Sequence, residues 1–255
     1  MPLNAMTLST VIITLNEEKN ITECLQSAFF SDEVIVVDSG STDLTVSLAE
    51  SMGAKIFKKD FQDFASQKNF GMDHATGDWI LLIDADERVT PALAKEIRKT
   101  LEEPKAEGYF VIRRNNIFGR WMRFGINRSD RQLRLIRKSM ARFEGFVHER
   151  ILFNGKTVNL KNPMLHFSTQ TIADYMKKLM LYSRLEAKIW EKSEKKIRAG
   201  EIVFRPLWVF CSNFFVKLGV LDGLEGFLFS VLSAYNEFVS LSRRLEPGLK
   251  NGVIS

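Results

Sequence analysis

Two carboxylates follow a short apolar stretch, and they are the residues of this chain best suited to chemistry. Residues 79–83 read WILLI, and Asp84 and Asp86 come directly after them. A short apolar run of this kind is typical of a buried strand, and open α/β sheets bind ligands at the carboxyl ends of their strands. Two hard anionic oxygens there suit a divalent metal that also contacts a diphosphate. The alternative is a solvated turn before a helix beginning near Thr90 and Pro91, because acidic residues also favour helix starts.

Polar side chains also follow the first two strands that the sequence predicts. These candidate ligand-binding residues are Thr14, Asn16, Glu17, Asp38 and Asp43. If neighbouring strands end at one edge of a sheet, these side chains converge on the same crevice as Asp84 and Asp86. Gly40 permits a turn with positive φ, and Ser41 or Thr42 is expected to cap the next helix. Each residue taken singly is equally consistent with ordinary turn chemistry, so the joint arrangement carries the prediction.

Strands and helices are predicted to alternate through the first hundred residues. Strands are expected at residues 8–14, 34–37, 54–57, 79–83 and 109–113. Helices are expected at residues 18–28, 42–51, 64–74 and 91–101. This alternation with apolar strands predicts a parallel sheet covered on both faces. From about residue 115 it fails, and residues 131–137, 147–153 and 163–167 are expected to form shorter strands of a mixed half. The sequence contains neither a P-loop nor a G-x-G-x-x-G pattern after a strand.

Composition indicates a globular protein of a reducing compartment. The 255 residues are 45% hydrophobic and 26% charged, which is outside the range of disordered chains. The two cysteines, Cys24 and Cys211, are too few for a disulfide framework or a zinc cluster. No basic region precedes an apolar stretch at the N-terminus, so no signal peptide is predicted. A cytoplasmic location follows as an expectation.

The net charge of +5 is unevenly distributed along the chain. Between Arg113 and Arg150 eleven basic residues, ten of them Arg, stand against Asp130, Glu144 and Glu149. Arginine binds phosphate bidentately, and no nucleic-acid-binding motif accompanies the cluster. A phosphorylated acceptor or anionic lipid headgroups are therefore the expected partners, with no nucleic acid. A merely solvated basic face is the alternative.

The C-terminal third has a different pattern. Residues 171–199 show the apolar spacing of one helix face, with Gly200 as the expected end. Residues 202–241 are strongly apolar and aromatic, but the uncharged stretch 206–216 is well short of the ~20 residues that span a bilayer. These segments are either core helices or helices lying in a membrane interface, and the interfacial interpretation is favoured. We accordingly expect one domain over residues 7–170 and a helical extension over residues 171–255.

Several motifs together resemble family 2 glycosyltransferases. They are VIITLNEE (residues 11–18), VVDSGSTD (36–43), QKN (67–69) and GDWILLIDADE (77–87). Three shorter motifs are similar to the branch of lipopolysaccharide-core β-1,4-glucosyltransferases, namely RLIRK (134–138), GFVHE (145–149) and LHFS (165–168). The first resemblance is dense and specific over residues 8–101. It implies a GT-A (Rossmann-like) α/β fold with a mixed sheet, helices on both faces and a C-terminal helical extension.

The resemblance also implies a reaction and roles for residues. A sugar, glucose in the named branch, would pass with inversion from a nucleotide-sugar donor, UDP-glucose, to a phosphorylated or lipid-linked glycan acceptor of the lipopolysaccharide core. Asp86 would hold Mg²⁺ or Mn²⁺ with Asp84 nearby, Asp84 facing the ribose. Further donor contacts would come from Thr14, Asn16, Glu17, Asp38, Asp43 and Lys68. Glu149 is the candidate base, and His148 and His166 are second-rank candidates for a metal ligand or phosphate contact.

Other classes and substrates stay open at this point. Glycosyl transfer to another cell-surface polysaccharide uses the same motifs. A haloacid-dehalogenase-type phosphatase also has D-x-D after an apolar strand, but it needs Thr or Val at the position of Arg88. A nucleotidyltransferase would need a Gly-rich basic loop after the first strand, and a non-enzymatic membrane adaptor leaves the acidic crevice unexplained. The transferase interpretation predicts an enzyme on the cytoplasmic face of the inner membrane.

Overall fold

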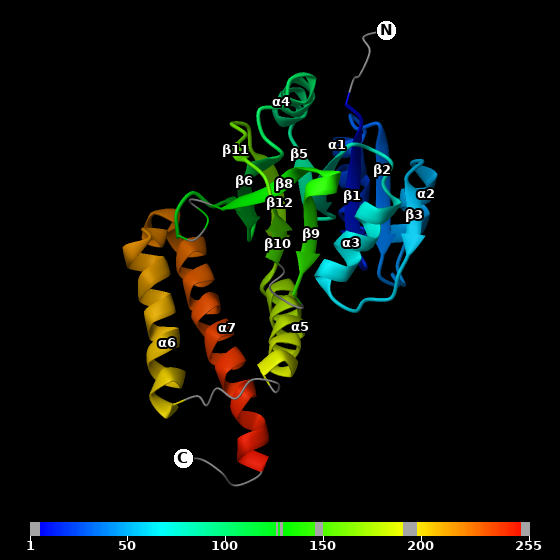
Figure 1. Cartoon of the computed structure of the whole chain (residues 1–255). Coiled ribbons are helices and arrows are strands. Elements are labelled where there is room, and N and C mark those ends of the chain that lie inside the picture. Colours follow the sequence, from blue (N-terminus) through cyan, green and yellow to red (C-terminus); the bar gives the residue numbers. More distant parts are fainter. Residues whose placement is uncertain (1–5, 126, 128–129, 146–149, 191–197, 251–255) are drawn as a thin grey trace. The chain divides into compact units, whose positions relative to one another are not determined.

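The computed structural model describes residues 6–125, 127, 130–145, 150–190 and 198–250. The chain forms two compact units, drawn together in Figure 1. The first unit contains residues 1–114 and 130–168, and the second contains residues 115–129 and 169–255. The residues predicted to do chemistry that the structure describes all belong to the first unit.

Four parallel strands form one half of the sheet in the first unit. They are β1 (Leu8–Thr14), β2 (Glu33–Asp38), β3 (Lys55–Lys58) and β4 (Trp79–Asp84), in the order β3-β2-β1-β4. The helices between them are α1 (Ile21–Ala28), α2 (Thr45–Ser51) and α3 (Phe64–His74). All six residues of β2 are buried, as expected for a parallel strand covered on both faces. The predicted strand–helix alternation is confirmed here.

The second half of the sheet is mixed. Its elements are β5 (Glu87–Val89), α4 (Pro91–Glu102), β6 (Gly108–Ile117), β8 (Arg131–Arg137), β11 (Thr157–Asn159) and β12 (Met164–Thr169). The strand order continues β4-β8-β6-β12-β5, with β8 antiparallel to β4 and β11 beside β6. A 3-10 turn (Lys138–Met140) leads from β8 to a separate pair of strands, β9 (Ala141–Glu144) and β10 (Arg150–Phe153). The side chain of Thr90 caps α4 through the N–H of Leu93.

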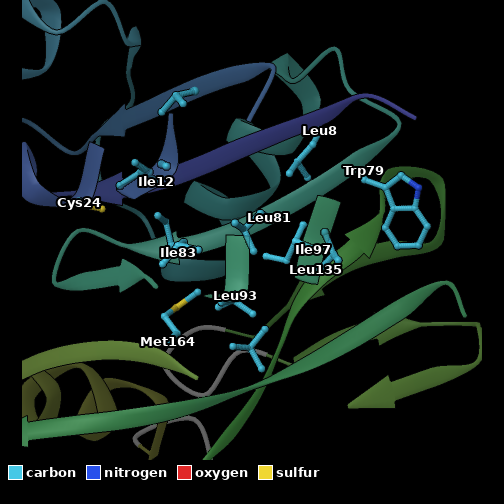
Figure 2. Close-up of a cluster of buried hydrophobic side chains, with 14 of the residues drawn as sticks. Leu8, Ile12, Cys24, Trp79, Leu81, Ile83, Leu93, Ile97, Leu135 and Met164 are labelled. Carbon is cyan, nitrogen blue, oxygen red and sulfur yellow. The ribbon is translucent and has the colours of Figure 1, made fainter. Parts of the chain in front are cut away.

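Apolar side chains cover both faces of the sheet. Ile12, Leu81 and Ile83 belong to one buried cluster with Leu93 and Ile97 of α4, drawn in Figure 2. The alternate strand positions belong to a second cluster, which includes Val11, Ile35, Val37, Ile80, Leu82 and Met72 of α3. Because successive side chains of a strand point to opposite faces, helices bury both faces. The structure confirms the α/β class with helices on both faces of a mixed sheet.

The second unit contains a helical hairpin and a further helix. Its elements are β7 (Arg120–Trp121), which pairs with the end of β6, α5 (Ile172–Trp190), α6 (Ala199–Cys211), a π-helical turn (Ser212–Val216), a 3-10 turn (Gly219–Asp222) and α7 (Gly223–Lys250). Gly200 lies in the first turn of α6, so the expectation that it ends the preceding helix was wrong. Among the described residues, none of the helices combines the length and the hydropathy needed to cross a bilayer.

The expected cap of α2 was also wrong. The helix begins at Thr45, and neither Ser41 nor Thr42 caps it. The hydroxyl of Ser41 donates to Asp38, and the backbone N–H of Thr42 donates to the side chain of Asn16 at 2.8 Å. These polar groups join two loops instead, which delays the helix by three residues relative to the prediction.

Candidate functional site

Three of the predicted site residues end neighbouring strands. The strand order β2-β1-β4 places β1 in the middle. In the register of these strands, Thr14 pairs with Asp38 and Ile13 pairs with Asp84. Thr14, Asp38 and Asp84 therefore lie at one edge of the sheet, where the prediction placed a ligand-binding crevice.

The loops that follow β1 and β2 are joined by side chains predicted to bind a ligand. Asn16 has a φ of 55° and accepts from Thr42 while its own N–H donates to Ser41 at 2.9 Å. The N–H of Glu17 donates to the hydroxyl of Thr45 at 2.8 Å, and the Glu17 carboxylate accepts from Asn20. Asn16 and Glu17 therefore join the two loops. Amide and carboxylate side chains can serve such a structural role as readily as they can bind a ligand.

Asp38 and Asp43 are likewise bound within these loops. Asp38 is buried and accepts from the N–H groups of Gly40 and Ser41, each at 3.0 Å. Gly40 has a φ of 95°, a conformation that favours glycine. Burial opposes ionisation of Asp43, but hydrogen bonds from Thr45 and from the N–H of Glu18 hold its pKa below the ordinary value. These contacts bond the two carboxylates to the protein's own loops.

Thr14 contributes a buried polar group that no described residue satisfies. Its Oγ1 is buried and has no hydrogen-bond partner in the part of the chain that the structure describes. Buried hydroxyls are nearly always paired with protein, water or ligand. The Thr14 hydroxyl at the end of β1 therefore calls for a water or ligand atom as its partner.

Asp84 belongs to a buried network of charges. Arg134 Nη2 lies 2.7 Å from Asp84 Oδ2 and 2.5 Å from Glu87 Oε1. Arg113 bridges Glu87, at 3.2 Å, and Asp130, at 2.9 Å. Burial opposes ionisation of Asp84, but Arg134, with Lys68 and Arg113, holds its pKa far below the ordinary range. Asp84 is ionised and its charge is already balanced by a guanidinium.

Asp86 has a different neighbour. The pairing of β5 with β12 places His166 opposite Glu87, and the N–H of Phe167 donates to the Asp86 carbonyl at 2.8 Å. His166 Nε2 consequently lies 3.5 Å from Asp86 Oδ1, with both side chains mostly buried. Among the described residues no group of three or more His, Cys, Asp and Glu side chains is arranged around a metal position. A carboxylate and an imidazole are nevertheless a ligand pair that fits a divalent ion such as Mn²⁺, with diphosphate and water oxygens completing its shell.

Arg88 fixes the loop that carries both acids. Its guanidinium donates to the carbonyls of Ala85 and Glu87, each at 2.9 Å, and lies 3.3 Å from the Glu23 carboxylate of α1. It also lies over the ring of Phe167, 5.5 Å from the ring centre. This buried arginine therefore attaches the D-x-D loop to both α1 and β12.

Lys68 is the predicted site residue that lies on α3. It is buried, and its Nζ lies 5.4 Å from the centre of the Phe143 ring. Its neighbours are structural: Gln67 donates to the carbonyls of Lys59 and Asp60, and Asn69 exchanges two hydrogen bonds with the backbone of Phe143. Because Lys68 lowers the pKa of Asp84, its charge acts on the D-x-D loop.

Glu149 and His148 lie outside the described residues, so their predicted roles stay predictions. Sequence reasoning missed Glu87, Arg88, Arg113 and Arg134 as members of the site. The RLIRK motif contained Arg134, but its spacing alone gave no partner for it.

A cavity of about 490 Å³ in the first unit is lined by residues of α3 and β9, including Asn69 and Phe143. Asp84 and Asp86 do not line this cavity. The candidate site is therefore defined by the carboxyl ends of β1, β2 and β4.

Comparison with known proteins identifies the class to which this fold belongs. The profile of glycosyl transferase family 2 matches residues 9–180. The chain therefore belongs to glycosyl transferase family 2, which confirms the expected family and its GT-A fold. This membership decides against the phosphatase, nucleotidyltransferase and adaptor interpretations.

Particular relatives cover nearly the whole chain. A Rickettsia conorii protein named as an uncharacterised glycosyltransferase is 32% identical over 96% of this chain and 92% of its own length. The lipopolysaccharide core biosynthesis glycosyltransferase LpsC of Rhizobium meliloti is 31% identical over 92% of this chain and 91% of its own. Among solved structures, S. aureus TarS 1–349 covers 97% of this chain and 92% of that chain, with 15% identity and a TM-score of 0.48.

Proposed function

We propose that this family 2 glycosyltransferase moves glucose from UDP-glucose to a glycan of the lipopolysaccharide core, with inversion at the anomeric carbon. Two observations support the assignment. The chain resembles LpsC over almost its full length, and Thr14, Asp38 and Asp84 share one sheet edge. The acids at the carboxyl ends of the strands carry the proposal. A nucleoside diphosphate needs groups that accept hydrogen bonds from its ribose hydroxyls, and it needs positive charge to balance its phosphates.

The donor would lie along this edge. Asp84 would accept from the ribose hydroxyls with the oxygen lone pairs that Arg134 leaves open, and the unpaired Thr14 hydroxyl would contact the base. Asn16, Glu17, Asp38 and Asp43 would shape the base and ribose site through the loops they join. Lys68 would contribute positive charge near the diphosphate.

A divalent metal would be held by Asp86 and His166, with Asp84 kept beside it as a ribose contact. The bound ion would supply Lewis-acid stabilisation of the charge that develops on the departing diphosphate. The mixed oxygen and nitrogen donors favour Mn²⁺ over Mg²⁺, because Mg²⁺ prefers oxygen ligands. Asp86 would also supply the negative charge that favours a cation at this metal position.

The displacement needs one base on the acceptor side. The acceptor hydroxyl oxygen forms its bond to the anomeric carbon while the bond from that carbon to the diphosphate oxygen breaks. Glu149 takes the hydroxyl proton, and the nucleoside diphosphate leaves with the bonding electrons. The position of Glu149 at the end of GFVHE, directly before β10, supports this assignment.

The metal assignment is tested by Asp86→Asn. We expect the variant to lose metal-dependent binding of UDP-glucose, because an amide oxygen cannot replace the carboxylate charge, and to keep its fold, because Asp86 follows the strand and lies outside the apolar core. Calorimetric titration with and without Mn²⁺, together with thermal melting, measures both. Glu102→Gln, an exposed acid at the end of α4, is the control. Unchanged metal dependence in Asp86→Asn would remove Asp86 from the site.

The cellular setting follows from the acceptor. We propose a glycosyltransferase domain over residues 7–170 and a helical extension over residues 171–255 that lies on the cytoplasmic face of the inner membrane without crossing it. Exposed apolar side chains on α6 support this, with Phe204 at 70% and Trp208 at 66% of their full exposure. An interfacial helix presents such residues to the boundary between headgroups and acyl chains.

A further inference from the structure

The second unit contains a cavity that the proposed reaction does not use. Its volume is about 690 Å³, and it lies between the loop around β7 and the turn that joins α6 to α7. These segments are neighbours in Figure 1, where the α6–α7 turn lies beside the loop after β6. Its lining mixes aromatic, apolar and charged side chains, among them Phe118, Arg120, Trp121, Arg123, Leu221 and Glu225. This combination suits a molecule with both a polar and an apolar part.

The walls of the cavity are held by buried hydrogen bonds. Asp222 is only 2% exposed, and its carboxylate accepts from the backbone N–H groups of Arg123 at 3.0 Å and Phe124 at 2.9 Å. The N–H of Gly125 donates to the carbonyl of Lys217 at 2.8 Å. Gly226 packs so closely on the carbonyl of Gly219 that a Cβ at this position would collide with it. These contacts join the two segments that line the cavity.

The two arginines of the cavity differ in their electrostatic surroundings. Arg120 is paired with Glu225 at 3.1 Å, which balances its charge. Arg123 is exposed, and its guanidinium forms no ion pair within the described part of the chain. A guanidinium of this kind, fixed through its own backbone, can bind a phosphate group bidentately.

Exposed apolar side chains lie on the turn that contributes to the cavity wall and on the start of α7. Those of the α6–α7 turn and the start of α7 are Phe215, Val216, Leu218, Val220, Leu221 and Leu224, with exposures from 39% to 67%. Leu221 is one of these residues and also lines the cavity. Trp121, 39% exposed, is an aromatic residue of the type enriched at the membrane–water boundary. The Asp222 carboxylate in the cavity wall is bonded to backbone N–H groups, so the Arg123 guanidinium forms no ion pair among the described residues. An apolar tip next to such an arginine is complementary to an anionic lipid surface.

We propose that this cavity binds the phosphate headgroup of an anionic membrane phospholipid at Arg123, while the apolar side chains of the α6–α7 turn enter the adjoining acyl layer. The inference rests on the membrane location in the proposed function and specifies which residues recognise the surface. Arg120 and Glu225 form the polar wall, and Trp121 lies at the level of the headgroups.

The test compares vesicle binding of the full chain and of three variants. The vesicles contain phosphatidylcholine alone or with about 30% phosphatidylglycerol, an anionic fraction that attracts juxtamembrane cations. Arg123→Gln should lower affinity for the anionic vesicles about fivefold, since it removes the phosphate contact and keeps the backbone N–H bonded to Asp222. Lys99→Gln, which removes one exposed charge from α4 in the other unit, is the matched control and should bind nearly as the parent does. Leu221→Ser combined with Leu224→Ser should weaken binding to both kinds of vesicle.

Three results would overturn the proposal: equal loss in Arg123→Gln and Lys99→Gln, equal binding of the parent to both vesicle types, or an apolar turn that proves to be a dimer interface by light scattering. Circular dichroism melting checks that each variant folds. Mn²⁺-dependent UDP-glucose binding without vesicles should be the same in Arg123→Gln as in the parent. If the parent itself fails to bind nucleotide sugar, the proposed function fails, and the vesicle result still decides the headgroup site.

Discussion

At the residue scale, the two acids of the D-x-D motif have different neighbours, and our proposal gives them different roles for that reason. Asp84 lies 2.7 Å from the Arg134 guanidinium, whereas Asp86 lies 3.5 Å from the His166 imidazole. A carboxylate already paired with a fixed cation is a weak metal ligand and a good hydrogen-bond acceptor. A carboxylate beside an imidazole has a neighbour that can itself bind a metal ion. The local environment therefore assigns the ribose to Asp84 and the metal to Asp86 in our proposal.

The proposed base is tested by Glu149→Gln. The amide is nearly isosteric but cannot take a proton, so transfer should fall by at least ~10²-fold while the donor binds as before. Single-turnover transfer from UDP-glucose and calorimetric donor titration separate the two effects. Near-normal turnover would move the base to another carboxylate, and Glu144 and Asp130 are the next to be replaced. A parallel fall in donor affinity would instead mean that Glu149 contacts the donor.

At the scale of elements, Arg134 joins three strands. It projects from β8 and reaches Asp84 at the end of β4 and Glu87 of β5. Glu87 Oε2 also accepts from the N–H of Asp84 at 2.9 Å. Burial lowers the tendency of Arg134 to stay charged, but Asp84 and Glu87 raise its pKa above the ordinary value. The antiparallel strand β8 thus supplies the charge that fixes the end of the parallel half of the sheet.

Arg134→Gln should lower the free energy of unfolding by about 3–5 kcal/mol at pH 7, because it removes the guanidinium from Asp84 and leaves the buried Glu87 with Arg113 alone. The low pKa of Asp84 contributes stability above its unfolded value of about 3.9, and that contribution is lost as pH falls through the folded pKa. The difference between parent and variant should therefore shrink below about pH 4. Urea unfolding at neutral and acid pH measures it.

The control for this prediction is Arg142→Gln. The Arg142 pair with Asp73 is about half exposed on both sides, at 54% and 52%, so its loss should change stability by less than about 1 kcal/mol. A pH-independent loss in Arg134→Gln equal to that of Arg142→Gln would show that the buried network does not stabilise the strand edge.

At the scale of the whole molecule, the basic residues divide into two groups. The sequence placed eleven of them between Arg113 and Arg150, and the structure pairs two of these with acids, the partly buried Arg113 with Glu87 and Asp130 and the buried Arg134 with Asp84 and Glu87. These two arginines are therefore unavailable to a phosphate outside the protein. An anionic surface would instead meet exposed basic residues such as Arg123. The excess of Lys and Arg over Asp and Glu gives the chain its net charge of +5.

Binding of the full chain to anionic vesicles should accordingly weaken strongly as salt rises from about 50 mM to about 500 mM, because the Debye length shortens severalfold. Binding to phosphatidylcholine vesicles, which depends on apolar insertion, should change little over the same range. Co-sedimentation at each salt concentration measures both. Salt-independent binding to the anionic vesicles would argue against an electrostatic contribution. Apolar contact would then be the remaining source of binding.

The sequence by itself determined the α/β class, most strands and helices of the first hundred residues, and the candidate strand-end acids. It could do so because buried parallel strands are continuous apolar runs and because polar residues end them at one edge of the sheet. Residues 64–74 and 131–137 form the predicted helix and strand without any shift of boundary. These features depend on neighbours in the chain, which a sequence pattern records.

Only the tertiary structure decided how the charges are paired and which loop residues support one another. Arg134 lies fifty residues from Asp84, and His166 lies eighty from Asp86, so sequence spacing carried no information about these contacts. The pairing of β8 with β4 and of β12 with β5 brings them together. Ser41 and Thr42 were predicted to cap a helix, but partners on the loop after β1 bind them instead. The partner of a polar side chain is the group that the tertiary fold brings within hydrogen-bonding distance. That group is known only once strands distant in the sequence have paired.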